Sequence, residues 1–112
     1  MKISKIKVIN KNTNYQIIIG KGVVSLLRGQ MKKLCPKTEK VGLILDKNVD
    51  KNFKIKIKRQ LHKYKIFTYE FLPNENLKSF SKANFLIEKL LENNLNRSDT
   101  IIAVGGGIIG DF

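Results

Sequence analysis

The sequence IIAVGGGIIGD, at residues 101–111, sets the organisation of this chain. Four apolar residues, too few for a helix, run directly into three glycines, and two β-branched residues, a fourth glycine and an aspartate follow. This order is typical of a buried strand that ends in a glycine turn. Because glycine has no Cβ and adopts positive φ freely, a ligand can lie against the main-chain N–H groups of such a turn.

The glycine turn predicts a site for an anion. If a helix begins at Gly107 or Ile108, its unpaired N–H groups and its dipole favour a pyrophosphate, and the turn is then a nucleotide site. The alternative is a tight corner between a strand and a helix, where glycine only excludes bulk. The spacing differs from the GxGxxG dinucleotide fingerprint, and the lysine of a Walker loop is missing.

Upstream of this turn the sequence alternates between strand and helix patterns. Strands are predicted at residues 3–8, 15–19, 41–45, 66–72 and 101–104, and helices at 24–34, 53–64 and 80–95. Residues 53–64 fit either pattern, and their length favours the helix. The polar residues 10–14 predict a hairpin between the first two strands. The fold class is therefore α/β: a Rossmann-like parallel sheet with flanking helices and an N-terminal hairpin.

The composition indicates one globular domain in a reducing compartment. The chain has 112 residues, of which 42% are hydrophobic and 28% charged. No apolar run approaches the roughly 18 residues of a membrane span, and residues 1–7 do not resemble a signal peptide. The single Cys35 is interpreted as a core or surface residue. We expect a cytoplasmic protein that has no membrane partner.

The net charge of +13 is concentrated in the first part of the chain. Residues 1–65 carry 18 Lys and Arg against three acidic residues, whereas residues 66–112 carry four against six. Lysines spread over a surface form a solvated face. A lysine-rich module that binds nucleic acid is the non-enzymatic alternative. Since no zinc-finger or RRM motif is present, we expect no nucleic-acid partner.

Two polar residues merit an interpretation of their own. Asp46 follows the apolar strand at residues 41–45, where it faces either the ligand crevice of an open α/β sheet or the first turn of a helix that it caps. The sequence leaves these two roles equal. His62 is the one histidine, so a metal site within these residues is not expected and His62 is interpreted as a surface residue.

Three motifs together resemble the 3-dehydroquinate synthase family. The sequence GGGIIGD at residues 105–111 resembles the family's GGGxxGD, and DKNV at 46–49 is similar to its D-x-N-V. The segment PNENLKS at 73–79 is similar to P-x-G-E-x-x-K-[ST], although Asn74 replaces the glycine and Pro73 stands one place nearer to it than usual. Asparagine tolerates the left-handed conformation, so this turn can be kept. Iron-dependent alcohol and glycerol dehydrogenases, which carry GGGxxxD, and other sugar-phosphate cyclases remain alternatives.

The resemblance implies an activity. The family converts 3-deoxy-arabino-heptulosonate 7-phosphate, a phosphorylated sugar acid, to 3-dehydroquinate and phosphate in the shikimate pathway of aromatic amino acid biosynthesis. Its cofactors are NAD and a divalent metal, zinc or cobalt, and we expect a homodimer when the protein is full length. Residues 1–112 would form part of the N-terminal NAD-binding domain, with the sheet incomplete at the C-terminus. The metal and substrate domain would lie outside this chain, so no catalytic or metal residue is expected in these residues, which alone would be inactive.

The resemblance also implies roles for individual residues. Asp46 would accept hydrogen bonds from the adenosine ribose hydroxyls, because a carboxylate accepts two from a diol. Glu75 and Lys78 would hold the cofactor, the glycine turn would face the pyrophosphate, and Asp111 would face the nicotinamide ribose. The predicted cofactor-binding residues are Asp46, Asn48, Asn74, Glu75, Asn76, Leu77, Lys78, Gly105, Gly106, Gly107, Ile108, Ile109, Gly110 and Asp111.

Overall fold

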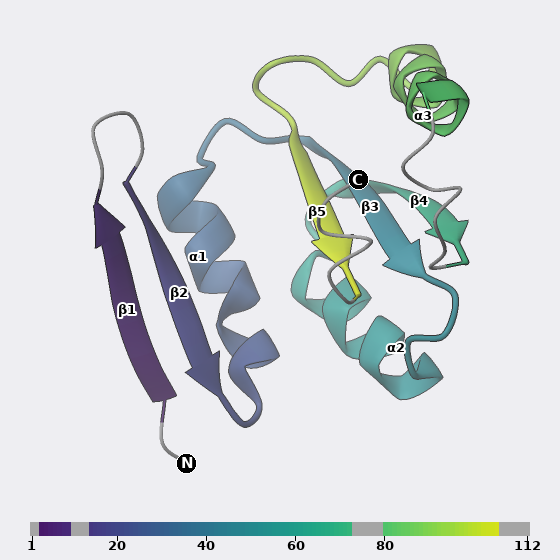
Figure 1. Ribbon diagram of the computed structural model, residues 1–112. Coiled ribbons are helices and arrows are strands. Elements are labelled where there is room, and N and C mark those ends of the chain that lie inside the picture. Colours follow the sequence, from purple (N-terminus) through teal and green to yellow (C-terminus); the bar gives the residue numbers. More distant parts are fainter. Residues whose placement is uncertain (1–2, 10–13, 73–79, 106–112) are drawn as a thin grey trace.

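The computed structural model describes residues 3–9, 14–72 and 80–105, which form two separate sheets (Figure 1). An antiparallel hairpin pairs β1 (Ile3–Ile9) with β2 (Asn14–Gly20). A parallel sheet has the strand order β4 (Lys65–Phe71), β3 (Lys40–Asp46), β5 (Thr100–Val104). The helical elements are η1 (Val23–Leu26), α1 (Leu27–Leu34), α2 (Lys51–Gln60) and α3 (Phe80–Glu92). The predicted α/β class, with its N-terminal hairpin, is confirmed.

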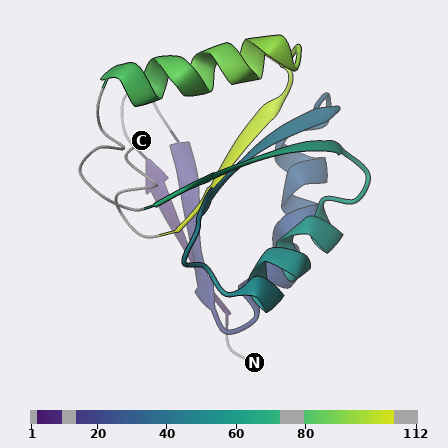
Figure 2. The same ribbon diagram turned by 90° about the vertical axis from the view of Figure 1, so that its right-hand side faces the viewer.

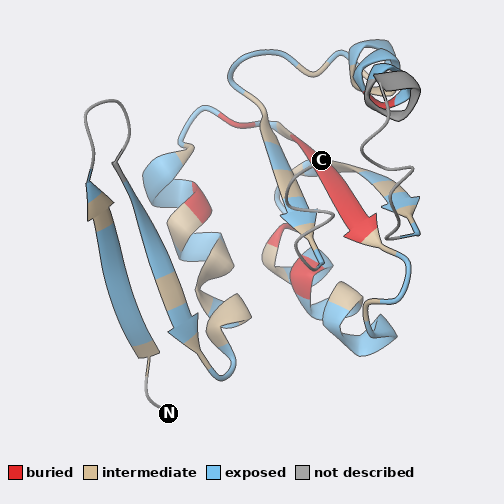
Figure 3. Cartoon of the chain, viewed as in Figure 1, coloured by how far each residue is buried: buried red, intermediate tan, exposed pale blue. Residues whose placement is uncertain are grey.

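Helices cover both faces of the parallel sheet (Figure 2). Val41, Leu43 and Leu45 of β3 are fully buried in a core with Met31 of α1 and Ile57 of α2. The intervening residues of β3 face α3, where Ile44 packs with Leu86. Figure 3 shows β3 as a continuous buried strand. An apolar strand covered on both sides is typical of a parallel sheet. The apolar run at residues 41–45 therefore agrees with the burial of β3 on both faces.

The ambiguous segment 53–64 forms a helix that begins earlier, at Lys51, and ends at Gln60. The helix α2 begins there because the Asp50 carboxylate accepts hydrogen bonds from the N–H groups of Asn52 and Phe53, at 3.1 and 3.4 Å. Such a cap satisfies N–H groups that have no partner within the helix. Ile57 is buried against the sheet, whereas Ile55 lies on the exposed side. The helical spacing of the apolar residues, and not the strand-like alternation, therefore matches the observed conformation of this segment.

The helix predicted at residues 24–34 consists of two parts. Residues Val23–Leu26 form a 3₁₀ turn, and the α-helix begins only at Leu27. Gly22 precedes the turn in a left-handed conformation, with φ 72°, and its carbonyl accepts the Ser25 N–H at 3.1 Å. This shorter i to i+3 spacing closes the tighter turn. Leu34, predicted on the apolar face, is exposed because the helix ends at this residue.

Asp99 ties together the segments that lead into β3 and β5. Its Oδ1 accepts the N–H groups of Lys40 and Glu39 at 2.9 and 3.2 Å, and its Oδ2 accepts the Asn96 N–H at 3.0 Å. These hydrogen bonds, that from Asn96 first, lower the pKa of the Asp99 carboxyl below its usual value of 3.8. A carboxyl with a depressed pKa stabilises the fold above that usual value and loses its contribution as the pH falls through the folded pKa.

Replacing Asp99 by asparagine is expected to lower the free energy of unfolding at pH 7 by about 1 kcal/mol, because an amide group has one acceptor oxygen and no charge. The difference from the wild type should shrink as the pH falls from 5 toward 3. Urea unfolding followed by circular dichroism at several pH values measures it. Glu92→Gln, which alters an exposed ion pair with Lys89, is the control and should change stability little. A difference that stays constant with pH would contradict the assignment.

Within the described residues, no helix is both long enough and apolar enough to cross a membrane.

Candidate functional site

The carboxyl ends of β4, β3 and β5 lie side by side at one edge of the sheet (Figure 1). Asp46, at the end of β3, pairs in register with Phe71, at the end of β4. Leu45 pairs with Val104, so Asp46 and Gly105 follow at the ends of neighbouring strands. Two of the three motifs identified in the sequence, those that start at Asp46 and Gly105, therefore begin at this edge. In open α/β sheets, ligands bind in the crevice outside the carboxyl ends of the strands.

The half-buried Asp46 organises the turn that follows β3. Its Oδ1 accepts the Asn48 N–H at 2.7 Å, and its carbonyl oxygen accepts the Val49 N–H at 3.1 Å. The N-cap of α2 is Asp50, four residues further on, so the interpretation of Asp46 as a helix cap is wrong. A carboxylate has about four lone-pair sites, and this turn uses one of those on Asp46. Its role toward a cofactor stays a prediction.

Gly105 follows β5 and has φ 154°, a backbone conformation that residues with a side chain rarely adopt. The first glycine of the motif is thus required by the backbone itself. The remaining predicted residues lie outside the described part of the chain. These are Asn74, Glu75, Asn76, Leu77 and Lys78 in one segment, and Gly106, Gly107, Ile108, Ile109, Gly110 and Asp111 in the other. Their predicted roles remain predictions.

A lysine that the sequence did not single out lies beside this edge. The Lys54 Nζ is 2.8 Å from Glu70 Oε1 and donates to the Lys47 carbonyl oxygen at 3.3 Å. The hydrogen bond from Lys54, together with its positive charge, lowers the pKa of the Glu70 carboxyl. Lys47 in turn donates its N–H to the Phe71 carbonyl at 2.9 Å. The turn after β3 is therefore held from two sides.

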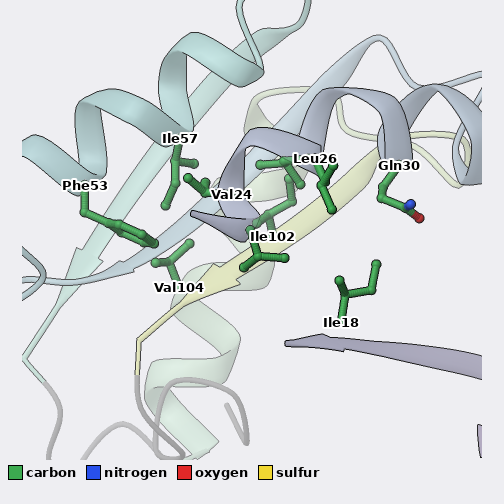
Figure 4. A pocket seen from close by; sticks show the side chains of 10 residues that line it. Ile18, Val24, Leu26, Gln30, Phe53, Ile57, Ile102 and Val104 are labelled. Atoms are coloured by element: carbon green, nitrogen blue, oxygen red, sulfur yellow. The ribbon is translucent and has the colours of Figure 1, made fainter. Parts of the chain in front are cut away.

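An apolar cavity of about 310 Å³ lies between the hairpin, η1, α2 and β5 (Figure 4). Among the described residues that line it, Gln30 is the polar one, and the others are aliphatic or aromatic. They include Ile18 of β2, Phe53 of α2 and Val104 of β5. Without a charged group in this lining, the cavity is unsuited to a phosphate. The polar groups at the carboxyl ends of the strands are the better candidates.

The described residues contain no group of three or more histidine, cysteine or acidic side chains that could hold a metal ion. His62 is exposed, and its Nδ1 lies 3.2 Å from the Arg59 carbonyl oxygen. Its interpretation as a surface residue is confirmed. Cys35 is half-buried against the core, one of the two places expected for it.

Comparison with known proteins identifies relatives of this chain. Residues 68–112 match the family described as 3-dehydroquinate synthase N-terminal. The chain is 37% identical to the 3-dehydroquinate synthase of Clostridium beijerinckii over 101 residues, which cover 88% of the chain and 29% of that protein. It is 35% identical to that of Streptococcus thermophilus over 110 residues, 96% of the chain and 31% of the relative. The chain thus spans less than a third of the length of these curated relatives.

A solved structure has the same fold. The crystal structure of 2-deoxy-scyllo-inosose synthase superposes with a TM-score of 0.81 over 96% of the chain and 30% of that protein, at 19% sequence identity. A parallel sheet covered on both faces, with Asp46 and Gly105 at its carboxyl edge, defines a Rossmann-like α/β domain. Within that class the resemblance indicated by the three motifs is confirmed: the chain is similar to the N-terminal part of 3-dehydroquinate synthases.

Proposed function

We propose that this chain is the NAD-binding portion of a 3-dehydroquinate synthase. The observation that carries the proposal is that Asp46 and Gly105, the first residues of two of the motifs, stand at the carboxyl ends of the neighbouring strands β3 and β5. Asp46 brings a carboxylate for a diol, and Gly105 has a backbone conformation that favours glycine. A related fold, in 2-deoxy-scyllo-inosose synthase, has been crystallised with carbaglucose-6-phosphate, NAD+ and Co2+.

The chemistry of these groups fits the cofactor. The Asp46 carboxylate keeps acceptor sites beyond the one that Asn48 uses, so it can accept hydrogen bonds from both hydroxyls of a ribose. A glycine turn after Gly105 would let backbone N–H groups approach a pyrophosphate. When bound, NAD supplies the acceptor and donor of a hydride. The residues of this chain bind and orient it.

The complete protein, on this proposal, converts 3-deoxy-arabino-heptulosonate 7-phosphate to 3-dehydroquinate and phosphate. Residues 1–112 form part of its N-terminal domain, and the zinc or cobalt ion and the substrate are held by residues outside this chain. We also propose that the protein is a cytoplasmic homodimer. A chelator that removes the metal should abolish the reaction while NAD binding persists.

Replacing Asp46 by asparagine tests the proposed site. The Asn48 N–H can still bond to the amide oxygen of asparagine, so the turn is kept while the charge and one acceptor are lost. The dissociation constant of NAD should rise about tenfold, the effect of one hydrogen bond to a charged group. Isothermal titration calorimetry or equilibrium dialysis with labelled NAD, on the complete protein as its own cells produce it, measures this constant.

Asp50→Asn is the matched control. It removes the same charge four residues away, and asparagine also caps helices well, so α2 and the affinity for NAD should be unchanged. A wild-type protein that binds no NAD at millimolar concentration would refute the proposal. An affinity for DNA of arbitrary sequence that decreases steeply as the salt concentration rises would instead support a nucleic-acid-binding module. Release of free NADH during turnover would support a dehydrogenase of the alcohol or glycerol type.

A further inference from the structure

The Lys54 ammonium joins three elements at the carboxyl edge. Lys54 lies in the first turns of α2, with its side chain 19% exposed. It forms an ion pair with Glu70 of β4 and donates a hydrogen bond to the carbonyl oxygen of Lys47, the first residue after β3. Lys47 follows Asp46 directly in the chain. One charged group therefore connects the helix, the strand β4 and the turn that carries the predicted ribose ligand.

The register of the sheet explains why these groups meet. Glu70 pairs with Leu45, whose side chain points to the face covered by α2. Side chains opposite each other in neighbouring strands share a face, so Glu70 also points toward α2. Glu70 stands one residue before Phe71, whose carbonyl accepts the Lys47 N–H. The ion pair and this backbone hydrogen bond thus act on the same connection between β3 and β4.

The energy of this contact argues against a purely stabilising role. An ion pair that reaches solvent contributes little to stability. Glu70 is exposed and Lys54 half-buried, so this pair is of that kind. Its geometric effect is larger, because the Lys47 carbonyl belongs to the same peptide group as the Asn48 N–H, which bonds to the Asp46 carboxylate. A small displacement of a binding group such as the Asp46 carboxylate changes the affinity for its partner even when the fold is intact.

We propose that Lys54 is a positioning residue for the cofactor: anchored by Glu70, it holds the Lys47 carbonyl and so fixes the direction of the Asp46 carboxylate. The proposal rests on the proposed function. It adds that the affinity for NAD depends on a helix side chain that does not touch the cofactor. Through this side chain, Glu70 of β4 also affects the position of the turn after β3.

Lys54→Met tests the proposal in the complete protein. Methionine keeps the length and helix propensity of the side chain but removes the ammonium. The dissociation constant of NAD should rise roughly threefold to tenfold, while the melting temperature stays within a few degrees of the wild type. Lys54→Arg should restore most of the affinity, because a guanidinium can reach both partners. Lys58→Met is the control: it removes a charge that also acts on Glu70, from the next turn of α2, and should leave the affinity unchanged.

Two further measurements test the positioning role of Lys54 independently. If the methionine variant does not fold, Glu70→Gln takes its place, since it weakens the anchor of Lys54 and should raise the same constant by a smaller factor. Amide hydrogen exchange without NAD should be faster at Lys47 and Asn48 in either variant. If wild-type protein binds NAD and Asp46→Asn weakens binding, but the Lys54 and Glu70 variants bind like the wild type, the positioning role alone is refuted. If the wild type binds no NAD, the proposed function fails and this role with it.

Discussion

Leu43→Ala is expected to lower the free energy of unfolding by about 3 kcal/mol, because it removes most of a fully buried side chain. Leu43 is 0% exposed and lies in the middle of β3, in the core that includes Met31, Ile57 and Leu61. Removing its three outer carbons leaves a cavity, because the surrounding side chains on the sheet and on α2 can move only partly into the empty space. Urea unfolding followed by circular dichroism measures the loss.

The loss is large relative to the total stability of a domain, about 5–15 kcal/mol. Because Asp46 ends the same strand, the carboxyl edge should be lost together with the core. Leu34→Ala is the control, since Leu34 is 68% exposed at the end of α1 and its truncation should cost little. A loss below about 1 kcal/mol for Leu43 would mean that β3 does not form the centre of the core.

Gly42→Val is expected to destabilise the protein by about 2 kcal/mol, through overpacking instead of a cavity. A Cβ at Gly42 would lie 2.9 Å from Leu90 Cδ2 and 3.4 Å from Leu95 Cδ2. A β-branched side chain adds two further methyl groups in the same space, so α3 must move away from the sheet. Thermal unfolding should show a lower melting temperature, by roughly 8 °C.

Gly29→Ala is the matched control for Gly42. Gly29 lies inside α1, and a Cβ there meets no atom within 4 Å. Alanine stabilises a helix relative to glycine by up to about 1 kcal/mol, so this variant should unfold at a slightly higher temperature. Equal changes in the two variants would show that α3 does not pack on Gly42.

The regular elements could be predicted from the sequence because their apolar spacing matches their burial. The run at residues 41–45 is apolar at every position except Gly42, and the structure buries it on both faces. The same logic identified α2, since Ile57 lies on the apolar stripe and is buried, whereas Ile55 lies off it and is exposed. The place of Asp46 at a strand end followed from the order of elements in a parallel sheet.

The details that failed depend on contacts between distant residues or on local backbone geometry. Asp46 and Asp50 both stand where a helix cap is found, and only the actual start of α2 at Lys51 separates their roles. The 3₁₀ turn at Val23 depends on the left-handed Gly22, which apolar spacing does not reveal. Lys54 is one of 18 basic residues in the first 65. Its partner Glu70 is 16 residues away in another element, so the pair becomes visible only in three dimensions.

If this chain binds NAD as proposed, the strand order of the parallel sheet would link ligand binding to the pairing of β5. Residues 47–64 connect β3 to β4, whereas residues 47–99 separate β3 from β5, on its other side. Closing the longer loop costs more chain entropy, so docking of β5 is the less favourable of the two pairings. A ligand held by segments from all three strands stabilises only the state in which β5 is in place. At a hundred times its dissociation constant, such a ligand adds about 2.7 kcal/mol to the stability of the fold, nearly what the Leu43 side chain provides.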